Sequence, residues 1–346
     1  GSTQSIRIRG TGSLNNADPL WVVDGIPSGG IDYLNPSDIE SISVLKDAAS
    51  AAIYGARGGN GVILVTTKKG AKGQPAQVTY DTYYGFQEPW KKIGLLNAEE
   101  YAILMNESRA AAGLVPLSQL ADPASLGEGT DWQEALFERA PMVNHSFNFT
   151  KGTATSSTAI GGSHFAQDGI IGGEKGRFER TTFRVSTQQD AGDRFRIGQT
   201  VNFTHISRNA LAENNEFATP VVRALNMDPV TPVSRPDGSY AYTELIGSDI
   251  ANPINQVATT YDNWMTNRFV GNLFGEYDLL KELKFRSSVN IDLSLGSQKI
   301  FLPQYDLGVG ENDPNRPAYE WREVNGLIRN ANEWSNWQRE NTLQHD

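Results

Sequence analysis

The segment from Ile6 to Gly70 reads IRIRGTGSLNNADPLWVVDGIPSGGIDYLNPSDIESISVLKDAASAAIYGARGGNGVILVTTKKG. Its apolar runs LWVVD, ISVLK and GVILVTTK predict short strands at 20–24, 42–46 and 62–68. Asn35 can cap a short helix that has Pro36 at its first position, and Asp47 can cap an Ala-rich helix near 48–54. The segment therefore predicts one compact α/β unit.

The composition excludes several classes of protein. The chain has 346 residues, of which 38% are hydrophobic and 10% aromatic, and this is enough to build a core. Cysteine is absent, so disulfides and a thiol nucleophile are excluded. The net charge is −10, and the small basic cluster at Lys68–Lys72 is no basic stripe. We therefore expect no nucleic-acid partner.

Downstream of this unit the sequence alternates strictly between apolar and polar residues. From Leu283 to Leu295 the odd positions are mostly apolar, whereas the even positions from Lys284 to Ser294 are polar or charged. The same alternation occurs near 195–204 and 78–86. Such segments predict β-strands with two different faces, and we expect the apolar row to face outward.

The connections between the predicted strands alternate in length. The strands are expected at 78–88, 143–151, 156–166, 177–189, 194–207, 265–279, 282–296 and from 333 onward. Short turns on one side and long loops on the other, such as 208–264 and 297–332, are typical of outer-membrane barrels, whereas crossovers would break this regularity in a sandwich. A lumen that holds a plug needs roughly 22 strands, so these are expected to be about eight of them.

Particular residues also carry a family resemblance. The segments RIRG, PLWVVDGIP and SDIESISVLKDAASAAIYGARGGNGVILVTTKKG resemble the plug of SusC/RagA-type TonB-dependent outer-membrane transporters. LLNAEEY, TDWQEALFERAPMVNHSF and LKFRSSVNIDLS continue the resemblance more loosely. It implies a mainly β protein, with the C-terminal part of a plug domain at 1–75 and the N-terminal portion of a transmembrane antiparallel β-barrel at 76–346. We expect an internal fragment that lacks a signal peptide, the TonB-contacting segment and the first part of the plug.

The resemblance further implies energy-coupled import of oligosaccharides or peptides across the outer membrane of a Gram-negative bacterium. The implied partners are the TonB complex, through a segment absent here, a SusD-like surface lipoprotein and outer-membrane lipid. Neither catalysis nor a cofactor is expected. Two alternatives remain from the residues alone. One is a secreted glycan-binding or glycan-degrading β-sandwich protein, and the other is a non-transporting outer-membrane adhesin barrel.

Candidate site residues fall into two groups. The first group matches the plug motif and is expected to hold the plug against the barrel: Arg7, Arg9, Asp24, Gly25, Asp38, Lys46, Asp47, Tyr54, Gly55, Arg57 and Gly61. The second group comprises aromatic residues that could contact substrate: Tyr240, Tyr242 and Trp264. Trp264, Trp334 and Trp337 also lie near strand ends, where a lipid-interface girdle is the favoured interpretation.

Other motifs predict no chemistry. The glycine-rich run at 55–61 leads from helix to strand, whereas phosphate loops lead from strand to helix. The four histidines are widely spaced and share no metal-ligand spacing, so lumen or interface positions are expected. The loop at 311–315 offers oxygen ligands for calcium but lacks EF-hand spacing, and a solvated acidic loop is favoured.

Overall fold

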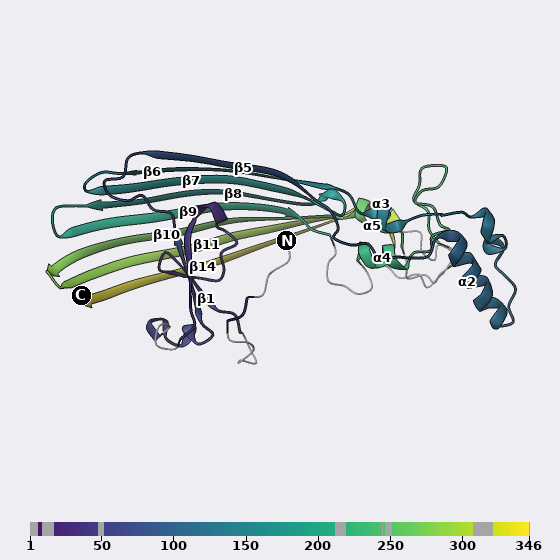
Figure 1. Cartoon of the computed structure of the whole chain (residues 1–346), viewed down its shortest axis with the longest axis horizontal. Coiled ribbons are helices and arrows are strands. Elements are labelled where there is room, and N and C mark those ends of the chain that lie inside the picture. Colours follow the sequence, from purple (N-terminus) through teal and green to yellow (C-terminus); the bar gives the residue numbers. More distant parts are fainter. Residues whose placement is uncertain are drawn as a thin grey trace.

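The computed structural model describes residues 6–8, 17–47, 52–211, 219–243, 245, 251–306 and 321–345. A small N-terminal unit, drawn in purple, lies against one face of a large curved sheet (Figure 1). Helices gather at one end of that sheet. Among the described residues, no helix combines the length and the apolar character needed to span a membrane.

The N-terminal unit contains a four-stranded mixed sheet in the order β2-β1-β4-β3. Its strands are β1 Leu20–Val23, β2 Ile26–Ser28, β3 Ile39–Leu45 and β4 Val62–Thr67. Strands β1 and β4 pair in parallel, and β3 pairs antiparallel with β4. The three predicted strands are confirmed, with β3 beginning three residues earlier than expected.

The helices of this unit are shorter than predicted. Asn35 does act as an N-cap, because its side chain accepts from the Ser37 amide at 2.9 Å, but the helix is only the 3₁₀ turn η1 Pro36–Asp38. The expected helix near 48–54 is wrong in its described part, where the 3₁₀ segment η2 Ala52–Gly58 stands instead. Gly55 has a φ of 59°, which interrupts regular helical geometry. Residues 48–51 lie outside the described residues.

The large sheet has eight strands, and every neighbouring pair is antiparallel. Its order is β14-β11-β10-β9-β8-β7-β6-β5, with β5 and β14 as open edges. The strands are β5 Gln77–Gln87, β6 Ala140–Gly152, β7 Ser156–Gly169, β8 Gly173–Asp190, β9 Phe195–Asn209, β10 Tyr261–Leu280, β11 Leu283–Leu302 and β14 Gly326–His345. All eight predicted strands are confirmed, although β11 and β14 extend well into the loop expected at 297–332.

The two ends of this sheet differ. At the end that we call the turn end, short turns connect β6 to β7, β8 to β9 and β10 to β11. The opposite loop end carries the segments with α2 Ala98–Ala111, α3 Trp132–Leu136, α4 Pro220–Asn226 and α5 Pro253–Thr259, drawn at the right of Figure 1. It also carries the 3₁₀ turns η3 Ser118–Leu120 and η4 Pro123–Ser125 and the short pair β12 Tyr305–Asp306 and β13 Trp321–Arg322.

The two faces of the sheet differ as the alternation predicts. On β11, Val289 and Ile291 are 41% and 46% exposed, whereas Asn290 and Asp292 between and beside them are only 4% and 2% exposed. The polar row faces the N-terminal unit, and we call this side the inner face. The apolar row lies on the outer face, so the predicted orientation of the two rows is confirmed.

Candidate functional site

The N-terminal unit is attached to the inner face through a buried arginine of β8. Arg184 is 1% exposed, and its guanidinium donates to Thr67 Oγ1 at 2.9 Å and to the Lys68 carbonyl at 2.6 Å. Asp24 in turn accepts from the Thr67 amide at 3.1 Å and pairs with Lys69 Nζ at 3.4 Å. A continuous polar chain therefore links the turn after β1, the end of β4 and the wall of the sheet.

A second contact places Asp38 beside a glycine of β7. A Cβ added at Gly161 would lie 2.9 Å from Asp38 Oδ1, so only glycine leaves room for this carboxylate. Burial raises the pKa of Asp38, although the nearby cations of Arg184, Lys68 and Arg180 oppose this effect. The site thus holds a carboxylate in a dry environment, balanced by arginines of the wall.

The segment after β2 makes a third set of contacts. Arg268 of β10 forms an ion pair with Asp292 of β11 at 2.7 Å and donates to Ser28 Oγ at 3.1 Å. The same guanidinium lies 4.4 Å from the centre of the Tyr33 ring. Thr204 of β9 donates to the Tyr33 carbonyl at 2.7 Å. Burial raises the pKa of Tyr33, so its phenol stays neutral at ordinary pH.

Apolar packing completes this interface. Val270 of β10 is buried in the same cluster as Val23, Ile26, Tyr33 and Ile63 of the N-terminal unit. It is an apolar residue on an inner face that is otherwise mostly polar. The unit is therefore held by one shared apolar contact surrounded by hydrogen bonds and ion pairs.

Only some of the predicted motif residues lie at this interface. Asp24 and Asp38 contact it, whereas Lys46, Asp47 and Arg57 are exposed. Tyr54 packs inside the unit, and burial together with Glu340 of β14 raises its pKa. Gly25 and Gly55 take positive φ values, and a Cβ at Gly61 would meet Ile8. Arg7 is exposed, and Arg9 lies outside the described residues.

Most of the wall residues that hold the unit were not singled out from the sequence: Gly161, Arg180, Arg184, Thr204 and Arg268. Arg180 donates to the Asp32 carbonyl at 3.0 Å. In the sequence, these residues could be recognised only as polar, charged or glycine residues at inward-facing positions of an alternating strand. That signal becomes specific only when the partner segment is known.

A cavity of about 240 Å³ remains between the N-terminal unit and the inner face at the turn end. Asp24 and Lys69 line it from the unit, and Arg196, Glu276 and Arg286 line it from the wall. Arg196 Nη1 lies 3.2 Å from Glu276, and Arg286 Nη1 lies 3.5 Å from the same carboxylate. The cavity is polar, and two wall arginines share the single carboxylate of Glu276.

At the loop end, two long connections pack together. The Trp132 indole is buried among α3, α4 and α5, and its Nε1 donates to the Asp228 carbonyl at 2.8 Å. Tyr240 is exposed next to a turn in which Asp237 accepts from the Ser239 amide at 2.9 Å. Hydrogen bonds from Ser239 hold the pKa of Asp237 below its usual range. Tyr242 lies 4.1 Å from the Arg235 guanidinium, so it contacts its own loop.

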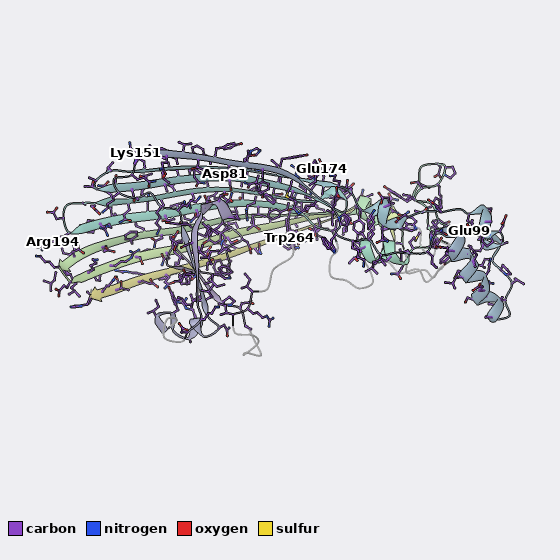
Figure 2. The ribbon with its side chains drawn as sticks, viewed as in Figure 1. Asp81, Glu99, Lys151, Glu174, Arg194 and Trp264 are labelled. Carbon is purple, nitrogen blue, oxygen red and sulfur yellow. The ribbon has the colours of Figure 1, made fainter. Side chains whose placement is uncertain are left out.

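The three tryptophans assigned to a girdle divide between the two faces. Trp337 lies opposite Ile291 on the outer face, but in the middle of β14 rather than near its end. Trp334 lies opposite Ser294, and Trp264 shares the spacing of Arg268 and Val270, so both are on the inner face. The girdle interpretation is therefore wrong for Trp264 and Trp334. Figure 2 shows Trp264 between the N-terminal unit and the helices of the loop end.

Three of the histidines share one row of the outer face. His145 lies opposite His164, and Thr181 lies opposite both His164 and His205. Their Nδ1 atoms contact Tyr80, Thr181 and Asn267 at 2.8, 3.0 and 2.9 Å. These three are at surface positions rather than in the lumen. Among the described residues no cluster of three metal-binding side chains occurs, and the loop at 311–315 lies outside them.

Comparison with known proteins gives consistent matches. Residues 1–62 match the family model described as TonB-dependent Receptor Plug Domain. The chain is 31% identical to TonB-dependent receptor P26 of Formosa agariphila over 100% of this chain and 34% of that receptor. It is 29% identical to TonB-dependent receptor SusC of Bacteroides thetaiotaomicron over 89% of this chain and 33% of SusC. The chain spans about a third of the length of these curated relatives.

The fold is similar to that of a solved assembly. A structure of the RagAB peptide importer in its closed-closed state aligns with a TM-score of 0.80 and 20% sequence identity. The alignment covers 98% of this chain and 40% of the matched chain. It includes both the N-terminal unit and the eight-stranded sheet.

Proposed function

We propose that this chain, which is SusC/RagA-like in sequence and fold, forms the plug and the first part of the barrel wall of a TonB-dependent nutrient importer of the outer membrane. The observation that carries the proposal is the seating of an α/β unit on the polar inner face of an antiparallel sheet whose outer face is apolar. A secreted sandwich would bury that apolar face, and an adhesin barrel would not need the unit. No catalytic role is proposed.

The proposal assigns residues 1–75 to the plug and 76–346 to the wall and its external loops. The linking segment at 68–76 passes from β4 to β5, and Gly70 packs so closely on β7 that a Cβ would lie 2.6 Å from the Thr158 carbonyl. The turn end would then be periplasmic and the loop end external, because outer-membrane barrels place short turns toward the periplasm.

We propose that Asp24 and Asp38 help to hold the plug in its closed position. Asp38 lies against Gly161 and near the wall arginines, and Asp24 accepts from Thr67, to which the wall residue Arg184 donates. Lys46, Asp47 and Arg57 are exposed, and we propose no such role for them. Opening would require the contacts of Arg184 and of Gly161 with the plug to break, and energy from the TonB complex would drive that step.

Oligosaccharides or peptides are the proposed substrates, and a SusD-like lipoprotein is the proposed surface partner. The match to a peptide importer supports the peptide alternative, while the aromatic residues of the inner face and external loops suit saccharides equally. Tyr240, which is exposed on an external loop, and Trp264 on the inner face are the proposed contacts from the sequence. Tyr242 is a weaker candidate because it already stacks on Arg235.

The function can be tested in cells that lack the full-length protein. Such cells should fail to take up part of a panel of labelled oligosaccharides and peptides, and uptake should return with the intact gene but not when the TonB system is inactivated. The protein should be recovered with the outer-membrane fraction. Unchanged uptake of the whole panel, or recovery in the culture medium, would contradict the proposal.

A further inference from the structure

One row of inner-face side chains runs between the plug and the external helices. Strand pairing places Phe178, Arg208, Trp264, Gln298 and Asn330 directly beside one another on β8, β9, β10, β11 and β14. We call these five residues the loop-end row. Plug contacts begin at the next inner-face position toward the turn end with Arg180 and continue one position further with Thr204 and Arg268. The row therefore lies on the loop-end side of the plug contacts, and Figure 2 shows one member, Trp264, between the plug and the helices of the loop end.

The residue types in this row are those that bind planar or ring-shaped polar ligands. Arg208 is exposed and stands between two aromatic side chains, with its guanidinium 5.2 Å from the centre of the Trp264 ring. Phe178 on the other side is half-buried and lies 6.1 Å from the Phe165 ring. The Trp264 ring helps to position the guanidinium, and both aromatic neighbours offer apolar surface to a ligand.

Arg208 has no carboxylate partner among the described residues. The carboxylate of Asp262, two residues along β10 from Trp264, accepts instead from Gln298 Nε2 at 2.9 and 3.0 Å. Gln298 Oε1 accepts from Asn330 Nδ2 at 2.8 Å. Gln298 and Asn330 are thus held by hydrogen bonds to Asp262 and to each other, whereas the Arg208 guanidinium is available to an anionic group.

We infer that the loop-end row binds an acidic oligosaccharide, with a carboxylate or sulfate of the sugar on Arg208 and sugar rings against Trp264 and Phe178. Phe178 and Trp264 are two strands apart, roughly 9.6 Å, so successive sugar rings can follow the row. The row offers a peptide fewer binding partners than it offers an acidic oligosaccharide. The strands that carry Phe178, Arg208 and Trp264 are each paired on both sides, so this part of the row offers a peptide backbone no free strand edge.

This inference rests on the proposed function, because it places a substrate in the lumen of an importer. It is tested with the full-length protein by measuring the affinity of three labelled probes of similar length: a neutral oligosaccharide, one that contains uronic acid, and an acidic peptide. The variants are Arg208→Gln, Trp264→Phe and Trp264→Ala. Arg329→Gln and Trp337→Ala are matched controls, because both residues are exposed on the outer face.

Arg208→Gln should weaken binding of the acidic oligosaccharide by roughly tenfold or more and leave the neutral one unchanged, since a charged hydrogen-bond pair is lost. Trp264→Ala should weaken binding of both sugars, and Trp264→Phe should do so less. Both controls should bind as the unaltered protein does. Heat-resistant migration of each variant in detergent establishes that the barrel has folded.

Equal affinities in Arg208→Gln, Trp264→Ala and the unaltered protein would overturn the site, and so would equal losses in the outer-face controls. Binding of the acidic peptide alone, lost in Arg208→Gln, would overturn the saccharide assignment. With each of these outcomes, uptake of another substrate would still support the proposed import function. Absence of any TonB-dependent uptake would instead reject import itself.

Discussion

At the scale of single residues, Gly161 and Gly162 show how adjacent positions of one strand meet opposite surroundings. A Cβ at Gly161 would lie 2.9 Å from both Asn148 Oδ1 and Asp38 Oδ1, whereas a Cβ at Gly162 has its nearest neighbour, the Thr182 carbonyl, at 3.7 Å. Gly161 leaves room for Asp38 of the plug, whereas Gly162 faces outward. A side chain is therefore tolerated at one position and excluded at the other.

We predict that Gly161→Val loosens the plug by about 1–3 kcal/mol, because the added methyl groups must displace Asp38 or Asn148. Gly162→Val should have little effect and serves as the matched control. Protease accessibility of the plug in the folded full-length protein measures the difference. Equal cleavage rates for the two variants would show that close approach at Gly161 does not hold the plug.

The raised pKa of Asp38 leads us to predict that plug seating, the attachment of the plug to the wall, depends on pH. Burial raises the pKa of its carboxyl above the unfolded value, so the folded state binds the proton more tightly than the unfolded state. The resulting stability is present below the unfolded pKa and is lost as the pH rises through the folded pKa. Plug seating should therefore strengthen as the pH is lowered from neutral into the acidic range.

Asp38→Asn should flatten this dependence, since the amide fits the same space and does not titrate. Glu40→Gln, which changes an exposed carboxylate of β3 in the same unit, is the control. Hydrogen exchange of β4 amides at a series of pH values, corrected for intrinsic exchange, reports the seating. If hydrogen exchange depends on pH in the same way in the unaltered protein and in Asp38→Asn, Asp38 is not the titrating group.

At the scale of elements, the alternation of each long strand sorts residues between lumen and lipid. The outer face carries a row that crosses the six strands from β5 to β10. Gly162 is its member on β7, and the other five strands contribute the aromatic residues Tyr80, Phe147, Phe183, Phe203 and Phe269. Next to it lies the row with the three histidines. Polar side chains on the outer face are thus bonded to their cross-strand neighbours, which reduces the cost of placing them there.

Phe203→Arg should impair barrel assembly by about 2–4 kcal/mol if this position lies near the middle of the bilayer. Phe203→Leu should be close to neutral because it stays apolar. The folded fraction after refolding into lipid vesicles over a denaturant series provides the measurement. If Phe203→Arg refolds to the same folded fraction as the unaltered protein, Phe203 does not face lipid.

At the scale of the whole molecule, the plug fills part of the inner face and must move for a substrate to pass. The pair Asp38→Cys and Gly161→Cys is suited to locking it, because a Cβ at 161 would lie 3.7 Å from the position of Asp38 Cγ. The chain contains no native cysteine that could interfere. The two positions lie on the plug and on β7, so a disulfide between them joins plug to wall.

In the full-length protein, the oxidised pair should reduce uptake to background while substrate affinity stays nearly unchanged. Reduction of the disulfide should restore uptake, and the reduced form is the control for both substitutions. Normal uptake with a fully formed crosslink would show that displacement of the plug at β7 is not needed for transport.

The long strands could be predicted from local sequence alone. Period-two alternation was explicit in three of the eight, and on β11 it assigned Asn290 and Asp292 to the inner face and Val289 and Ile291 to the outer face, because successive side chains of a strand point to opposite sides. The same rule could have placed Trp264, which shares the spacing of Arg268. Its position just outside the predicted strand at 265–279 led to the girdle interpretation instead.

Which residues meet across the interface depends on tertiary packing. Asp24, Thr67 and Arg184 come from three distant parts of the chain, and no local pattern marks Arg184 as the residue that binds the plug. The 3₁₀ geometry at 52–58 and the room for Asp38 at Gly161 likewise depend on packing that local propensity does not contain. Alternation fixes the direction of a side chain, but its partner depends on how the plug lies against the wall.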